Sequence, residues 1–219
     1  MNKEVKKTIA EINIQLTKHI LDHCKGKKIL LDVSGGHDTR VNLSILLKYN
    51  IPFDVFTRRL SHGDMEIASK ICDKFNLNQY KFYKRNTLDD EKELLKKYDV
   101  HLKGTGYSEY MCMLHKLNKS INKINEINDY RKTKKRNPKT YNPAFEDDVI
   151  NLIHDIPLIY LMGGYIQKKL IKQNYPKLLK FPFTYYDFRH LLMNKLHMRV
   201  VDALANTWKT GTKRNYHES

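Results

Sequence analysis

The sequence predicts an α/β protein built on a doubly wound parallel sheet, with a helical C-terminal part. Short apolar runs alternate with amphipathic segments through the first half of the chain, as expected for strands and covering helices. The first of these runs ends abruptly in a glycine turn, and a helical pattern follows directly. From residue 143 onward the pattern is helical, with prolines at the joins. We expect one domain over residues 1–219.

The expected elements follow the chain in order. Apolar spacing over residues 4–24 predicts an N-terminal amphipathic helix that stops near Gly26, so residues 1–26 form the first segment. The α/β core is expected over residues 27–115. Its strands are predicted at 28–33, 53–57, 79–83 and 100–104, and its helices from near residue 38 and at 65–75 and 88–98.

A basic loop is expected over residues 116–142, followed by the helical part over 143–219. The loop contains the run Arg131-Lys132-Thr133-Lys134-Lys135-Arg136 and has almost no apolar face. Helices of the C-terminal part are predicted at 149–154, 158–173 and 185–205.

Composition limits the classes of function. Forty Lys and Arg against 24 Asp and Glu give a formal net charge of +16. This charge predicts an anionic partner, a nucleotide or a nucleic acid, unless the lysines only fill solvated faces. Three scattered cysteines without a C-x-x-C pair argue against a disulfide framework, a zinc site and an iron–sulfur cluster. The sequence contains no signal-peptide pattern and no apolar membrane span, so we expect a cytoplasmic protein with no membrane partner.

The most specific motif is the turn Ser34-Gly35-Gly36-His37-Asp38-Thr39. Glycines allow the backbone to approach a ligand closely, so the turn can direct several N–H groups at one phosphate. The positive end of the following helix adds to this attraction, and two hydroxyls can donate to phosphoryl oxygens. The turn is not a Walker A loop, because the spacing and the lysine of that loop are absent. The alternative interpretation is a helix cap with a tight turn.

This motif resembles the Ser-Gly-Gly-x-Asp-Ser/Thr signature of the PP-loop ATP pyrophosphatase superfamily, whose fold is the adenine nucleotide alpha hydrolase-like type. Within it, the chain resembles the synthetase domain of asparagine synthetases. The segments that carry the resemblance occur in the family's order: Phe56-Thr57 with Asp64, Ala68 and Cys72; Gly104-Thr105-Gly106-Tyr107-Ser108-Glu109; Pro143 to Asp147; and Lys168 to Lys172.

The chain departs from that family at two points. Thr105 and Ser108 stand where asparagine synthetases carry aspartates that help to hold Mg²⁺, and only Glu109 is retained there. The glutaminase domain of the family is not expected, because residue 2 is Asn rather than the nucleophile that begins that domain. Glutamine is therefore not the expected nitrogen source within this chain.

The resemblance implies ATP and Mg²⁺ as cofactors and an adenylated intermediate formed with release of pyrophosphate. It implies catalytic roles for Asp38, Lys168 and Glu109, with Asp38 also on the metal. Expected nucleotide contacts are Ser34, Gly35, Gly36, His37, Asp38, Thr39, Thr57, Arg58, Gly104 and Gly106. The alternatives are a helix cap at Asp38, a solvated lysine at Lys168 and a turn-stabilising role for Glu109. Arg40 either reaches phosphate from the first helical turn or is exposed on the surface.

Three functional hypotheses follow. The leading one is an amide-forming ligase that adenylates a small carboxylate. The second is a PP-loop enzyme that modifies RNA bases, with the run from Arg131 to Arg136 holding RNA phosphates. The third is an inert nucleotide-binding or RNA-binding module, suggested by the residues at positions 105 and 108.

Overall fold

The computed structural model describes residues 3–58, 63–83, 88–104, 139–157, 160 and 164–183. Within these residues five strands form one sheet in the order β3-β2-β1-β4-β5, and every neighbouring pair is parallel. The strands are β1 (Ile29–Asp32), β2 (Asp54–Arg58), β3 (Gln79–Phe82), β4 (Val100–Leu102) and β5 (Thr140–Tyr141).

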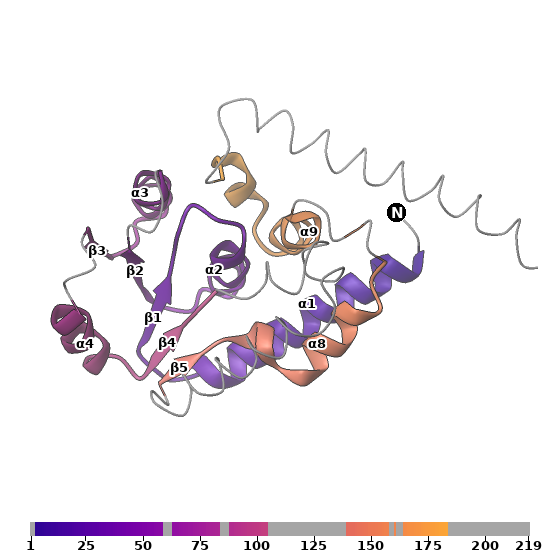
Figure 1. The fold of residues 1–219 in the computed structure, drawn as a ribbon. Helices are drawn as coiled ribbons and strands as arrows, with labels where there is room; N and C mark the ends of the chain where they lie inside the picture. Colours follow the sequence, from indigo (N-terminus) through magenta and orange to yellow (C-terminus); the bar gives the residue numbers. More distant parts are fainter. Residues whose placement is uncertain are drawn as a thin grey trace, which may run out of the picture.

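Helices cover both faces of this sheet (Figure 1). The α-helices are α1 (Lys3–Cys24), α2 (Asp38–Lys48), α3 (Asp64–Phe75), α4 (Leu88–Lys96), α8 (Asp147–His154) and α9 (Tyr165–Asn174). The described residues also include the 3-10 helices η1 (Pro143–Phe145) and η3 (Pro176–Lys180). A parallel sheet with helices on both faces confirms the predicted α/β class, and the strand order is compatible with a doubly wound fold.

The two faces have separate hydrophobic cores. The larger core joins apolar residues of α1, α2, α3, α8 and α9 to one side of the strands, including Ile29 and Leu31 of β1. The smaller core lies under α4 and contains Leu30, Phe56 and Leu94. Alternate residues of a strand point to opposite faces, so a strand buried on both faces is a continuous apolar run. This explains the run that β1 shows in the sequence.

The predicted N-terminal helix is confirmed as α1. Its buried residues recur at helical spacing, at Val5, Ile9, Ile12, Leu16 and Ile20. This stripe faces the larger core, where α1 packs against α8 and α9. None of the helices in the described part of the chain is both long and apolar enough to cross a membrane.

Two predicted boundaries are wrong. The basic loop does not extend to residue 142, because Thr140 and Tyr141 form β5 and pair with His101 and Leu102 of β4. Two residues are too few to show an alternating pattern, and their strand conformation depends on pairing with β4. The helix expected at 158–173 begins only at Tyr165, because Gly164 has a left-handed φ of 71° that no α-helix can continue through. The helix expected at 185–205 and the run 131–136 lie outside the described residues.

The strand order places a topological switch point beside β1. The chain runs from β1 to β2 and β3 with α2 and α3 on one face, then crosses by α4 on the opposite face to β4 on the other side of β1. Open α/β sheets bind ligands outside the carboxyl ends of their strands at such a point. The glycine turn, which directly follows β1, lies at this edge of the sheet.

Candidate functional site

The glycine turn is held in shape by its own side chains. The Ser34 N–H donates to Thr39 Oγ1 at 3.1 Å, and the two hydroxyl oxygens lie 3.2 Å apart. The Gly36 N–H donates to Ser34 Oγ at 3.1 Å. The turn therefore closes on itself, and the two hydroxyls predicted to contact phosphate lie together where α2 begins.

Two neighbouring elements fix the position of the turn. The buried carboxylate of Asp64, the first residue of α3, accepts a hydrogen bond from the Gly35 N–H at 3.0 Å. On the β4 side, Gly104 packs directly against the backbone of the turn, since a Cβ at Gly104 would lie 2.5 Å from Thr39 Cα. The sequence predicts that Gly104 contacts the nucleotide. The structure shows that this position has no room for a side chain, so only glycine fits there.

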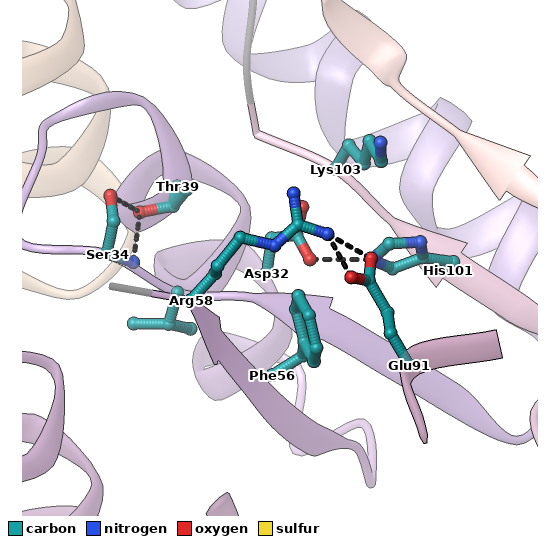
Figure 2. A pocket seen from close by; sticks show the side chains of 9 residues that line it. Asp32, Ser34, Thr39, Phe56, Arg58, Glu91, His101 and Lys103 are labelled. Atoms are coloured by element: carbon teal, nitrogen blue, oxygen red, sulfur yellow. Dashed lines mark hydrogen bonds and ion pairs between the residues drawn. The ribbon is translucent and has the colours of Figure 1, made fainter. Parts of the chain in front are cut away.

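A cavity of about 150 Å³ opens beside the turn on the α4 face of the sheet (Figure 2). Its lining combines the predicted residues Ser34, Thr39 and Arg58 with residues that the sequence interpretation did not select. The additional polar lining residues are Asp32, Glu91, His101 and Lys103, and Val33 and Phe56 supply apolar surface. The carboxyl ends of β1, β2 and β4 all contribute to this cavity, so it occupies the switch point.

Four polar side chains that line the cavity form two pairs (Figure 2). His101 Nε2 lies 2.6 Å from Asp32 Oδ1; His101 is 3% exposed, whereas 20% of the Asp32 side chain is exposed. Arg58 forms an ion pair with Glu91 of α4, in which one guanidinium nitrogen donates to both carboxylate oxygens. Lys103, at the end of β4, makes no side-chain hydrogen bond or ion pair with any described residue, so its ammonium group can bind an anionic ligand.

His37 and Asp38 of the turn lie beside α9 and Gly164 instead. Gln167 Nε2 donates to Asp38 Oδ1 at 3.3 Å. The His37 ring stacks on Phe183 with ring centroids 3.9 Å apart, and it lies against Gly164, where a Cβ would come within 3.0 Å of the ring. Asp38 and His37 therefore connect the turn to the C-terminal part of the chain and do not line the cavity.

Lys168 lies on α9, near Phe183, and is 4% exposed. Its Nζ is 5.9 Å from the centre of the Phe183 ring, and it makes no ion pair with any described residue. Burial lowers the pKa of Lys168 from 10.5 to about 8, because desolvation disfavours the ammonium form. Lys168 is therefore not the solvated lysine of the alternative interpretation, although it does not line the cavity either.

Both expectations for Arg40 are wrong. The side chain is fully buried and donates to the carbonyl oxygens of Gly35, Leu178, Phe181 and Pro182. Its guanidinium carbon also lies 4.0 Å from the centre of a ring, that of Phe183. Arg40 thus joins the glycine turn to the segment after η3. The carbonyl groups that surround the guanidinium determine this role.

Thr57 and Asp38 have structural positions that differ from the predicted roles, and two other predicted residues are not described. Thr57 is fully buried and accepts a hydrogen bond from Gln79 Nε2 at 2.8 Å, so its hydroxyl is engaged within the sheet. Asp38 is the first residue of α2, and the cap position belongs to His37, whose side chain makes no capping hydrogen bond. Gly106 and Glu109 lie outside the described residues, so their roles stay predictions.

Two aspartates at the turn could contribute ligands to a metal ion. In the described part of the chain, no group of three or more His, Cys, Asp or Glu side chains is placed to hold a metal ion by itself. Mg²⁺ does not require such a group, since it is usually bound by one or two carboxylates together with phosphates. Asp32 lines the cavity two residues before the turn, and Asp38 belongs to the turn but does not line the cavity.

The residues that were missed had a weak signal in the sequence. Asp32 ends an apolar strand, and His101 lies between two apolar residues of β4. Alternation along paired strands could have placed both on one face, but only with the register known. Glu91 is one of several acidic residues on α4, and nothing in the sequence distinguishes it from the others.

A scan against models of known protein families gives no match to the chain, and no curated protein sequence matches it significantly.

Proposed function

We propose that the chain is an ATP-dependent ligase that adenylates a small carboxylate, releases pyrophosphate, and then forms an amide with loss of AMP. One observation carries the proposal most directly. The hydroxyls of Ser34 and Thr39 line the same cavity as Arg58 and Lys103, at the switch point of a parallel sheet. Hydroxyl donors, a helix N-terminus and cations around one cavity are the groups that bind phosphates.

In the proposed reaction, these groups stabilise the negative charge that develops in the transition state. A substrate carboxylate oxygen attacks the α-phosphorus, the bond to the bridging oxygen breaks, and pyrophosphate leaves with the electron pair. Negative charge grows on the leaving group, and in this proposal Lys103 and the hydroxyl pair of Ser34 and Thr39, which line the cavity, stabilise that charge. An amine then attacks the acyl carbon and displaces AMP.

Mg²⁺ in this proposal neutralises charge on the phosphates when it is bound. The resemblance assigns its carboxylate ligand to Asp38, which lies at the start of α2. The proposed cation Lys168 lies in the same region, because Gln167, its neighbour on α9, donates to Asp38. With a pKa of about 8, Lys168 is mostly protonated at neutral pH and can serve as a cation there.

The second candidate is a PP-loop enzyme that modifies RNA, and the net charge of +16 favours it. Lysines and arginines that neutralise RNA phosphates would release cations condensed on the RNA, so the affinity for RNA would fall steeply with salt. In this case the adenylated group would be a base carbonyl rather than a carboxylate.

A pyrophosphate-release assay with ATP and Mg²⁺ separates the two candidates. Release that requires an amino acid or another small carboxylate supports the ligase, and release that requires bulk tRNA supports RNA modification. No release under either condition, with ATP still bound, contradicts both and leaves an inert binding module.

Variants of the turn test where the chemistry occurs. Ser34→Ala and Asp38→Ala should reduce pyrophosphate release by about 100-fold or more, the loss typical of removing one preorganised group at a reacting centre. Lys172→Ala is the matched control, since Lys172 is an exposed lysine on α9. Full turnover in both turn variants would show that the proposed phosphate site is wrong.

A further inference from the structure

We propose that Asp32, oriented by His101, is the carboxylate that binds the Mg²⁺ ion of the nucleotide in this cavity. The inference rests on the proposed ATP site, and it differs from the assignment of this role to Asp38. Asp32 is the last residue of β1, two residues before Ser34, and its side chain lies in the cavity (Figure 2). Asp38 does not line the cavity, and its carboxylate accepts a hydrogen bond from Gln167.

His101 holds one oxygen of Asp32 in place. His101 Nε2 lies 2.6 Å from Asp32 Oδ1, and in the tautomer that carries its proton on Nε2 the imidazole donates to the carboxylate. The imidazole is almost fully buried and stands edge-on to Phe56, with ring centroids 5.9 Å apart. Among the described residues Asp32 makes no other side-chain hydrogen bond, so its second oxygen can bind a ligand.

The charges around the cavity explain why that ligand is a cation. A phosphate bound by Ser34 and Thr39 would lie in the same small cavity as the negative charge of Asp32. Arg58 is paired with Glu91, which leaves Lys103 as the unpaired cation among the described lining residues. A divalent ion between Asp32 and the phosphate oxygens turns this repulsion into attraction.

The arrangement also matches the preferences of Mg²⁺. This ion is usually bound through one or two carboxylates plus substrate phosphates, and it keeps several water ligands. Carboxylates that bind metals are themselves hydrogen-bonded by a buried neighbour, which fixes their direction. His101 supplies such a neighbour, and it is a positioning residue because it acts only through Asp32.

The test measures ATP binding by calorimetry with and without Mg²⁺, a readout independent of turnover. Wild-type protein should bind ATP more tightly with Mg²⁺. In Asp32→Asn, which keeps the shape of the side chain, this enhancement should fall by about 10-fold or more. ATP binding without Mg²⁺ should stay the same or tighten, because a negative charge beside the phosphates is gone. Glu93→Gln, on the exposed surface of α4, is the charge control and should keep the full enhancement.

Variants of His101 test the positioning role. His101→Phe keeps a ring against Phe56 but removes the donor, and it should lower the Mg²⁺ enhancement by about 10-fold. His101→Gln retains a donor and should recover part of the enhancement. A merely structural role for His101 would change stability in both variants and leave the enhancement intact, which would contradict the proposal for this residue.

The possible results separate the inference from the proposed function. Wild-type protein that binds no ATP under either condition refutes both. ATP binding with an enhancement that Asp32→Asn retains and Asp38→Asn loses refutes the inference alone. A measurement without variants is a crystal of wild-type protein with Mn²⁺ and a non-hydrolysable ATP analogue. The metal should then lie about 2 Å from an Asp32 oxygen, and a metal bound elsewhere overturns the inference.

Discussion

Replacing Lys168 with methionine should make the protein more stable at neutral pH. Methionine preserves an unbranched apolar chain of similar length and removes only the buried charge. Burial lowers the Lys168 pKa from 10.5 to about 8, and each pKa unit corresponds to about 1.4 kcal/mol. The charged lysine therefore costs roughly 3 kcal/mol at pH 7, and Lys168→Met should raise the free energy of unfolding by roughly 2 to 3 kcal/mol.

The stability difference between Lys168→Met and wild type should depend on pH in a defined direction. Below pH 8 the lysine is protonated in both the folded and the unfolded state, so the full cost of burying the charge is present. Between pH 8 and 10.5 the folded state loses the proton while the unfolded state keeps it, so wild-type stability rises with pH. The stability difference between Lys168→Met and wild type should therefore shrink across this window.

Urea unfolding from pH 7 to 10 measures the difference, with Lys172→Met as the control for an exposed lysine on the same helix. The subtraction removes other titrating groups that both proteins share. A Lys168→Met protein that is less stable at pH 7, or a difference that stays constant with pH, would refute the reasoning. Loss of pyrophosphate release in the stabilised variant would identify a lysine kept for function at the expense of stability.

Three further predictions come from other positions. Gly104→Ala should weaken ATP binding and destabilise the fold by about 1–3 kcal/mol, because its Cβ would collide with the Thr39 backbone; calorimetry and urea unfolding measure both effects. Arg40→Lys should cost about 3 kcal/mol or more, because one ammonium cannot satisfy the carbonyls that the guanidinium binds, and thermal unfolding that matches wild type would contradict this. Cys24 and Cys72 should react with a thiol reagent only slowly in the native protein, since burial raises their pKa values to about 11 and about 12; fast reaction at pH 8 would show them to be accessible.

The first half of the fold was predictable from local pattern. The strand, glycine turn and helix around residues 28–47 were predicted within one or two residues, because a buried strand and an amphipathic helix differ in length and period. β5 was not predicted, since a strand of two residues exists only through its pairing with β4. The register that brings His101 next to Asp32 is a property of the assembled sheet, and no local pattern contains it.

The candidate site was predicted only where it is local in sequence. The hydroxyls of Ser34 and Thr39 belong to one motif, so their meeting could be anticipated. Arg40 was missed because three of its four partner carbonyls follow it by well over a hundred residues. An arginine in the first turn of a helix gives no sign in the sequence that distant carbonyls will enclose it.

The contact between Arg40 and the carbonyls of residues 178–182 has a consequence for synthesis on the ribosome. The sheet strands are complete once residue 141 has emerged, but the guanidinium still lacks most of its acceptors at that stage. Until that segment emerges, water must satisfy the guanidinium donors that these carbonyls later engage. The contacts of Arg40 with residues 178–182 therefore form only after that segment has left the exit tunnel, although the glycine turn is made much earlier.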